Sequence, residues 1–160
     1  DGLECFIASP VSLFLGVILL LISTSADFEF VKNVTLLNNF GFSLIIFSGA
    51  IFSFLFYNSH PAKIFMGDTG SLAIGGFLIA VSFVTGTVMY LLLFGILFVL
   101  TGLSVMLQVS YYKLTKKRIF LMAPLHHHFE KKGYHEAKIA TIYSMITIVF
   151  SLIIILLEFM

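Results

Sequence analysis

The sequence predicts an all-α, polytopic integral membrane protein with about five transmembrane helices. Of its 160 residues, 59% are hydrophobic and only 11% are charged. The mean hydropathy of +1.08 is far above that of a soluble globular domain. The charged residues gather in short segments between long apolar stretches. A net charge of +1 also argues against a nucleic-acid-binding protein, which would need a strongly basic face.

Five apolar stretches approach the roughly 20 helical residues needed to cross a hydrocarbon core of about 30 Å. They lie near residues 6–22, 40–57, 72–86, 88–109 and 139–157, in one transmembrane domain over residues 1–160. Only Gly86-Thr87 separates the third stretch from the fourth, which predicts a tight helical hairpin. Gly75-Gly76 in the third stretch would permit close helix packing. No span carries a charge at its middle, which argues against a transporter or ion channel.

The basic residues predict the orientation of the spans. With five spans, the connecting segments alternate between the two sides, and eight of the nine Lys and Arg residues then fall on one side; only Lys32 falls on the other. Positive charge marks the cytoplasmic side. The opposite side receives residues 23–39, where Asp27 to Phe30 alternate between polar and apolar in the manner of a small hairpin or surface strand. Cys5 is the only cysteine, so no disulfide forms within the chain.

A first polar motif, Asn58 to Ser71, lies on the predicted cytoplasmic side. Gly67 and Gly70 free the backbone on both sides of Asp68, and Ser71 is expected to cap the third span. The exposed N–H groups of such a helix end favour a phosphate. A carboxylate beside a phosphate calls for a cation, and magnesium is commonly held by one or two carboxylates plus substrate phosphates. The alternative is a simple turn that enters a helix.

A second polar motif is the run from Ala123 to Gly133, with three adjacent histidines, a carboxylate and two lysines. In a helix the three histidines point in different directions and cannot hold one metal, and a zinc site needs three or four convergent ligands. Contacts of His126 or His127 with Glu130 are possible at helical spacing. Hydrogen bonding to phosphate or nucleotide is the preferred interpretation. The alternative is a surface loop whose basic residues only fix orientation.

A third segment, Asp1 to Glu4, lies at the cytoplasmic entrance to the first span. Its two acids are three residues apart and share one side of a helical turn. They would contact a metal, a base or a ribose, or serve only as acids of a helix start.

Together these motifs identify the chain as similar to a known family. Phe65-Met-Gly-Asp-Thr-Gly-Ser71, followed by Ala123-Pro-Leu-His-His-His-Phe-Glu-Lys-Lys-Gly133, resembles the phospho-N-acetylmuramoyl-pentapeptide transferases. These enzymes form a branch of the polyprenyl-phosphate N-acetylhexosamine 1-phosphate transferases. The resemblance extends over the whole chain and corresponds to the C-terminal half of a ten-span protein. The histidine run followed by Phe-Glu is the feature that points to the muramoyl-pentapeptide branch.

The resemblance implies magnesium-dependent phosphoryl transfer in the bacterial cytoplasmic (inner) membrane, with the active face cytoplasmic. Undecaprenyl phosphate would attack the sugar-bearing phosphate of UDP-N-acetylmuramoyl-pentapeptide, giving lipid I and UMP in the first membrane step of peptidoglycan synthesis. Membrane lipid and the N-terminal half of the same protein would be further partners, and no nucleic acid is expected. The oligomeric state, a homodimer included, is left open.

The resemblance also implies roles for individual residues. Asp68 would hold the Mg²⁺, and Asp1 matches the first acid of an Asn-Leu-Thr-Asp-Gly-Leu-Asp-Gly motif in the active site. The expected catalytic residues are Asp1, Asp68, His126, His127 and His128. The expected substrate-binding residues, at or near the nucleoside, are Gly2, Leu3, Glu4, Asn58, Phe65 and Gln108.

Two departures from the family pattern bear on these expectations. Glu4 stands where the family has Asp, and Cys5-Phe6 replaces Gly-Leu. The paired aspartates and the lysine of the family's N-terminal half are absent, so these 160 residues alone are expected to be inactive. Two rival functions are a sister transferase that uses UDP-N-acetylglucosamine, and an inactive truncated paralogue that acts as a membrane scaffold.

Overall fold

The computed structural model describes residues 2–24, 34–58 and 61–158, and every regular element in these ranges is a helix. This confirms the predicted all-α class. Five of the helices are long and apolar enough to cross a membrane, as in a polytopic membrane protein. Asp1 and the predicted hairpin or strand near residues 27–30 lie outside the described residues. The helices are α1 (Gly2–Thr24), α2 (Val34–Asn58), α3 (Gly67–Thr85), α4 (Val88–Phe94), α5 (Ile96–Thr115), α6 (Leu125–Lys131) and α7 (Glu136–Glu158).

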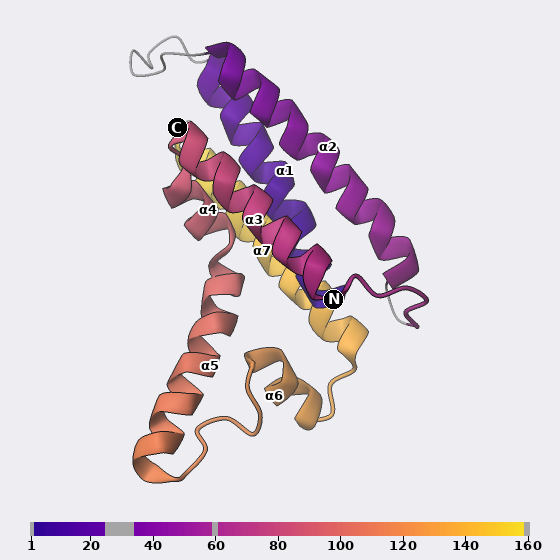
Figure 1. The fold of residues 1–160 in the computed structure, drawn as a ribbon, viewed down its shortest axis with the longest axis vertical. Helices are drawn as coiled ribbons and strands as arrows, with labels where there is room; N and C mark the ends of the chain where they lie inside the picture. The colour runs from indigo at the N-terminus through magenta and orange to yellow at the C-terminus, as the bar shows by residue number, and fades with distance from the viewer. Residues whose placement is uncertain (1, 25–33, 59–60, 159–160) are drawn as a thin grey trace.

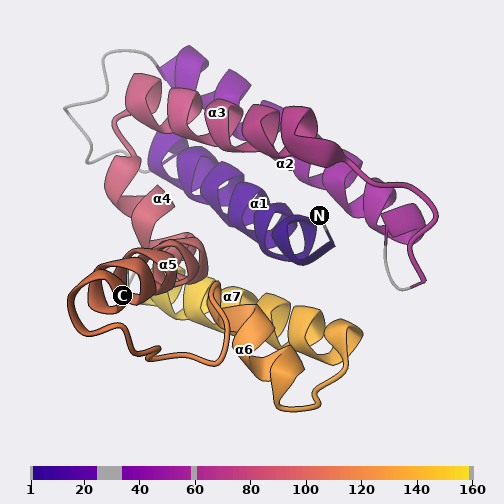
Figure 2. The same ribbon diagram turned by 60° about the horizontal axis from the view of Figure 1, so that its bottom comes forward.

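Helix α1 lies at the centre of the bundle and supplies more of the described core than any other helix. It packs along α2 on one side and along α7 on another (Figures 1 and 2). Its fully buried side chains include Val11, Leu15 and Leu19, which recur every four residues. This spacing keeps them on one face of the helix. The most apolar of the spans is therefore also the most enclosed by protein.

Small residues let α1 and α2 approach closely. A Cβ atom added at Gly16 would lie 2.8 Å from the carbonyl oxygen of Gly41, a distance that real Cβ atoms essentially never show. A buried pair of serines accompanies this approach. The Ser48 hydroxyl donates to the Ser9 carbonyl oxygen at 2.7 Å, and the Ser9 hydroxyl donates to the Ser48 carbonyl oxygen at 3.3 Å. Close backbone approach at small residues is a common way for membrane helices to associate. The predicted packing role of Gly75-Gly76 is wrong in α3, because a Cβ atom added at either glycine would meet no atom of a neighbouring element within 4 Å.

The predicted hairpin between the third and fourth stretches is confirmed. Gly86 ends α3 in the left-handed conformation with φ of 73°, which glycine adopts without steric cost. The amide N–H of Thr87 then donates to the Ser82 carbonyl oxygen at 2.9 Å, and α4 begins at the next residue.

The predicted fourth span over residues 88–109 is wrong, because the chain bends at Gly95. The seven-residue α4 ends there and the 20-residue α5 begins at Ile96. A Cβ atom at Gly95 would lie 2.9 Å from the Leu91 carbonyl oxygen, so the bend is built around a residue without a side chain. Beyond it α5 diverges from the bundle (Figure 1).

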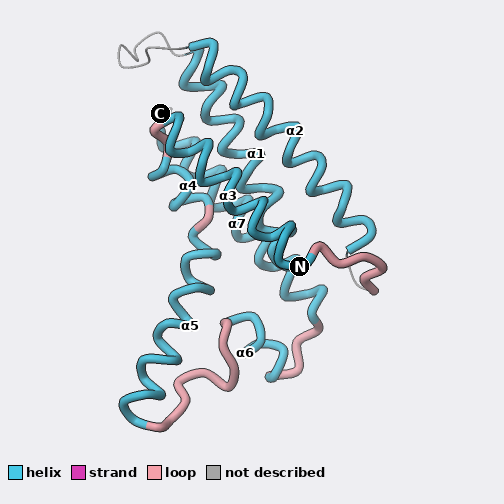
Figure 3. Tube along the Cα trace, viewed as in Figure 1, coloured by secondary structure: helices cyan, strands magenta, loops and turns pink. Residues whose placement is uncertain are grey.

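The polar segments meet at one end of the molecule. The start of α1, the loop that enters α3, and α6 lie toward the same end, and the turn between α3 and α4 lies at the other (Figure 1). Short helix α6 sits between two loops that join it to α5 and α7 (Figure 3). The three motifs singled out from the sequence are thus carried to one end of the bundle.

Candidate functional site

The acidic motif forms the first turn of α3. Gly67 has φ of 67° and starts the helix, with Asp68 next to it in the exposed first turn. The predicted cap at Ser71 is wrong, because its hydroxyl lies inside the helix and donates to the Gly67 carbonyl oxygen at 3.3 Å. The helix begins five residues before the predicted boundary since the left-handed Gly67 turns the chain directly into it. An acid in a first turn is stabilised by the helix dipole.

Asn58 ties the loop before α3 to the end of α2. Its side-chain amide donates to the Ile64 carbonyl oxygen at 2.7 Å, and the amide N–H of Lys63 donates to the Tyr57 carbonyl oxygen at 2.8 Å. Asn58 is only 4% exposed, yet its Oδ1 atom has no hydrogen-bond partner among the described residues. A buried, unpaired oxygen of this kind is costly unless a ligand or water pairs with it. Phe65, which follows Ile64, is 73% exposed.

Glu4 stands at the polar end of an apolar groove of about 430 Å³ between α1, α3, α4 and α5. Ser71 lies at the same end, and the remaining lining is almost entirely apolar. The Glu4 side chain is exposed, whereas Leu3 beside it packs against the core. Gly2 is the first residue of α1. The groove therefore combines a long apolar wall with a single carboxylate.

The three histidines of α6 have three different environments. The Nδ1 atom of His127 lies 2.6 Å from a carboxylate oxygen of Glu130, which confirms the second of the two predicted His–Glu contacts. The Nδ1 atom of His128 accepts the amide N–H of Leu121 at 3.1 Å. The ring of His126 lies against that of His127, with centroids 4.3 Å apart, and its buried Nδ1 atom has no hydrogen-bond partner in the described part of the chain.

The pKa of His126 depends on burial of its ring and on nearby charged groups, one of them on α1. Burial of the ring, followed by the neighbouring His127, lowers the pKa of His126 below its ordinary value of 6.5. The carboxylates of Glu130 and Glu4 act in the opposite direction. The influence of Glu4 is the smallest of these, in keeping with a position on α1, whose start lies toward the same end of the molecule as α6. His126 is neutral at pH 7, with a buried nitrogen available to a ligand.

Gln108 on α5 holds the loop that precedes α6. Its Oε1 atom accepts the amide N–H groups of Ile119 at 3.1 Å and Phe120 at 2.9 Å, and its Nε2 atom donates to the Phe120 carbonyl oxygen at 3.2 Å. Ser104, one helical turn earlier, accepts the amide N–H of Leu125 at 3.1 Å. Gln108 also lines a cavity, but most of its hydrogen-bonding capacity serves the loop. The role of Ser104 was not predicted, although its i,i+4 spacing from Gln108 is visible in the sequence.

A cation at this end of the molecule would take its protein ligands from carboxylate or imidazole side chains. No group of three or more His, Cys, Asp or Glu side chains in the described part of the chain converges as a metal cage. Asp68 offers an exposed carboxylate in the first turn of α3. This arrangement fits a magnesium ion that arrives with substrate phosphates and takes only one or two carboxylates from protein.

Comparison with known proteins places the chain in a family. The family model described as glycosyl transferase family 4 matches residues 1–87, more than half of the chain. The chain is a polytopic membrane protein that belongs to glycosyl transferase family 4.

Curated relatives refine this placement. The chain is 45% identical over 157 residues to a phospho-N-acetylmuramoyl-pentapeptide-transferase of Caldicellulosiruptor bescii, covering 96% of the chain and 44% of that relative. Relatives of the same name from Rubrobacter xylanophilus and Clostridium perfringens are 56% identical over 103 residues and 51% identical over 115 residues. Those alignments cover 64% and 69% of the chain, and 31% and 36% of the relatives. The chain thus spans less than half the length of these proteins, and the resemblance to this transferase branch is confirmed.

Proposed function

We propose that the intact protein transfers phospho-N-acetylmuramoyl-pentapeptide from UDP to undecaprenyl phosphate at the cytoplasmic face of the bacterial inner membrane. An oxygen of the acceptor phosphate forms a new bond to the sugar-bearing phosphorus of the donor. The bond between that phosphorus and the oxygen bridging to UMP breaks, and the products are lipid I and UMP. The observation that carries this proposal is that the start of α1, the loop that enters α3 and the histidine helix α6, which bear the three polar motifs, lie toward one end of the bundle.

The apolar groove supports a polyprenyl phosphate as the acceptor. Its walls come from four helices and its polar residues, Glu4 and Ser71, lie at the end near the start of α3. A long isoprenoid chain fits such a wall, because burying apolar surface is favourable by about 25 cal/mol per Å². The phosphate would then lie beside the first turn of α3.

Two residues support a nucleotide as the donor. The buried, unpaired Oδ1 atom of Asn58 can accept an N–H or O–H group of a nucleoside. The exposed ring of Phe65 offers a stacking surface in the same loop. Glu4 keeps the acceptor oxygens that the family's Asp supplies, on a side chain one methylene longer.

Asp68 would hold the Mg²⁺ ion, and the ion would supply neutralisation of the phosphate charge during transfer. Glu130 orients His127 through Nδ1 and leaves Nε2 available to a phosphate oxygen. The Nδ1 atom of His128 accepts the amide N–H of Leu121 and so positions the loop, which leaves the Nε2 atom of His128 for substrate. The three histidines thus contribute unequal functions to one wall of the site. Asp1, which lies outside the described residues, is proposed as a further active-site acid.

The donor specificity tests this function. The intact protein, in membranes containing undecaprenyl phosphate and Mg²⁺, is expected to release UMP from UDP-N-acetylmuramoyl-pentapeptide. UDP-N-acetylglucosamine is expected to give little or no UMP under the same conditions. The reverse preference would favour the sister transferase, and no UMP from either donor would favour a non-catalytic scaffold.

A further inference from the structure

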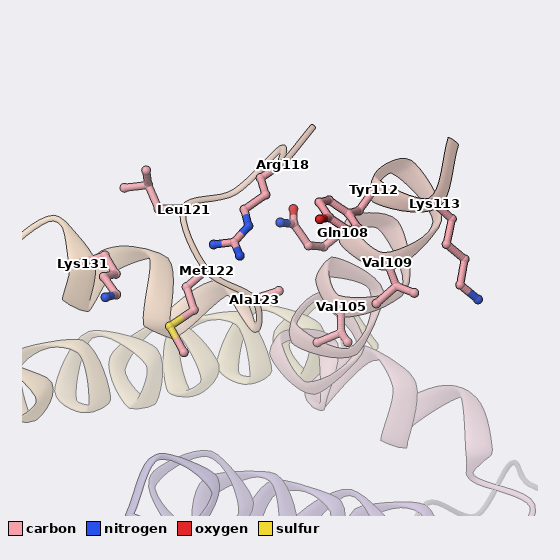
Figure 4. Close-up of a pocket in the computed structure, with 10 residues that line it drawn as sticks. All are labelled: Val105, Gln108, Val109, Tyr112, Lys113, Arg118, Leu121, Met122, Ala123 and Lys131. Atoms are coloured by element: carbon pink, nitrogen blue, oxygen red, sulfur yellow. The ribbon is translucent and has the colours of Figure 1, made fainter. Parts of the chain in front are cut away.

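A second cavity, of about 790 Å³, lies between the distal half of α5, the loop over residues 118–123 and the end of α6. Its volume falls in the range of pockets that enclose small organic ligands. The guanidinium of Arg118 extends between Gln108 and Met122, and Lys131 lies across the cavity on α6 (Figure 4). Lys113 belongs to the same lining but points away from the other side chains (Figure 4).

The charge of this cavity is not balanced by the protein. Its lining contains Arg118, Lys113 and Lys131 but no acidic residue. In the described part of the chain the one salt bridge joins His127 to Glu130, so neither Arg118 nor Lys131 has a carboxylate partner. An unpaired guanidinium beside a partly enclosed space favours an anion, because charge-assisted hydrogen bonds strengthen as water is excluded.

The rest of the lining is built from small or flexible apolar side chains. Val105 and Val109 present one helical face of α5, and Met122 and Ala123 come from the loop. A ligand that fits both parts therefore carries a carboxylate or phosphate together with methyl-sized apolar groups. A purely polar anion would leave this wall unused.

The cavity adjoins the candidate site. Leu121 lines it, and the amide N–H of Leu121 donates to His128. Lys131 belongs to the same short helix as the histidines. Gln108, which lines the cavity, also fixes the loop between the two regions. A donor bound at the histidine wall can thus reach this cavity with a part that extends away from the reacting phosphates.

We propose that this cavity binds the peptide arm of the sugar-nucleotide donor, with the terminal carboxylate of the peptide on Arg118 and Lys131. The inference rests on the proposed function. A peptide joined to a muramoyl group through its amino end keeps a free terminal carboxylate, and five extended residues span about 17 Å. The planar guanidinium of Arg118 matches a carboxylate in a bidentate way, and alanine-sized side chains match the apolar wall.

The test compares three donors in the intact protein: the muramoyl-pentapeptide donor, the same donor with a terminal carboxamide, and the muramoyl donor without peptide. Arg118→Gln is expected to raise KM for the first donor about tenfold, the equivalent of one lost charge-assisted hydrogen bond, with little change in kcat. KM for the other two donors is expected to change less than twofold. Arg118→Lys keeps the charge and should recover part of the loss, and Lys117→Gln, at an exposed lysine outside the cavity lining, is the matched control that should leave all three KM values unchanged.

Any other pattern of KM changes contradicts the proposal. Equal KM changes for all three donors would make Arg118 a structural residue or a ligand of the nucleotide. Unchanged KM values, combined with an altered response to phosphatidylglycerol vesicles, would assign the cavity to a lipid headgroup. Turnover of all three donors by the wild type together with either result would leave the proposed function intact while excluding the peptide site. No turnover of any donor by the wild type would reject the proposed function and this inference with it.

Discussion

The α1–α2 pair and the α5–α6 region are held together in opposite ways. Between α1 and α2, Gly16 and Gly41 bring two backbones into contact, and long rows of apolar side chains are buried. Between α5 and α6, most apolar side chains of α5 are exposed, and Gln108, Ser104 and His128 bind the intervening loop through its backbone. The α1–α2 pair is held by close packing, whereas the α5–α6 region is held by a few directional hydrogen bonds.

The densely packed α1–α2 pair forms the scaffold, whereas the α5–α6 region forms part of the candidate site. Dense packing resists small changes because each displaced side chain meets another. A loop held by a few hydrogen bonds can open locally at far lower free energy. The histidines and the cationic cavity lie beside the loop that is held by a few hydrogen bonds. Local opening of this loop would allow a substrate to enter and leave. The apolar groove, by contrast, has α1, the helix of the densely packed core, as one of its walls.

The largest effect is expected from filling the close approach of the scaffold. Gly16→Leu places a side chain where the Gly41 carbonyl oxygen already lies 2.8 Å from a Cβ position. The helices must separate, and we expect a loss of about 3 kcal/mol or more in the free energy of unfolding, at the upper end of overpacking effects. Denaturation in mixed micelles measures it. Gly49→Leu is the control, because a Cβ atom added at this glycine of α2 would meet nothing within 4 Å, and it should unfold like the wild type. Equal stability of both variants would show that shape does not fix this pair.

A smaller and local effect is expected at Gln108. Gln108→Ala leaves the amide N–H groups of Ile119 and Phe120 without their acceptor. We expect hydrogen exchange of these two amides to speed up by about tenfold or more, since each lost bond is worth about 1 kcal/mol. Exchange within α1 and α2 should not change. Ser110→Ala, on an exposed serine of the same helix, is the control. Faster exchange across the whole bundle would contradict the separation of scaffold and site.

The smallest effect is expected from pH, through His126. Because the pKa of His126 is lowered in the folded protein, the unfolded chain binds more protons between that pKa and 6.5. The stabilisation is thus complete above about pH 6.5 and is lost as the pH falls below it. We expect the melting temperature to fall from pH 7.5 to pH 5.5, and to fall less in His126→Gln. An identical pH dependence in the two proteins would show that His126 does not titrate in this way.

The sequence predicts the scaffold better than the details of the site. Long apolar stretches must form helices in a bilayer, because no water is present to pair their backbone groups. The bend at Gly95 could not be predicted in this way, since the apolar composition continues without interruption across it. The start of α3 was misplaced because Ser71 is a typical cap, whereas the left-handed turn at Gly67 decides the boundary.

Contacts within the site could be predicted from the sequence only where the two residues are close together in it. The His127–Glu130 pair is local, and its helical spacing reveals it. The bonds from Gln108 to Phe120 and from Ser104 to Leu125 join separate segments, and no local pattern predicts them. The placement of the start of α1 and of α6 toward one end of the molecule depends on the packing of α1 against α2 and α7.

The role of Asp68 is the central claim, and UMP release by the intact protein tests it most directly. Asp68→Asn keeps the shape of the first turn of α3 but removes its negative charge. We predict that Mg²⁺-dependent release of UMP from UDP-N-acetylmuramoyl-pentapeptide falls about a hundredfold or more, as expected when one preorganised electrostatic contact is removed. Glu136→Gln, which removes the first-turn acid of α7, should retain wild-type turnover. Wild-type turnover and an unchanged Mg²⁺ dependence in Asp68→Asn would contradict the account.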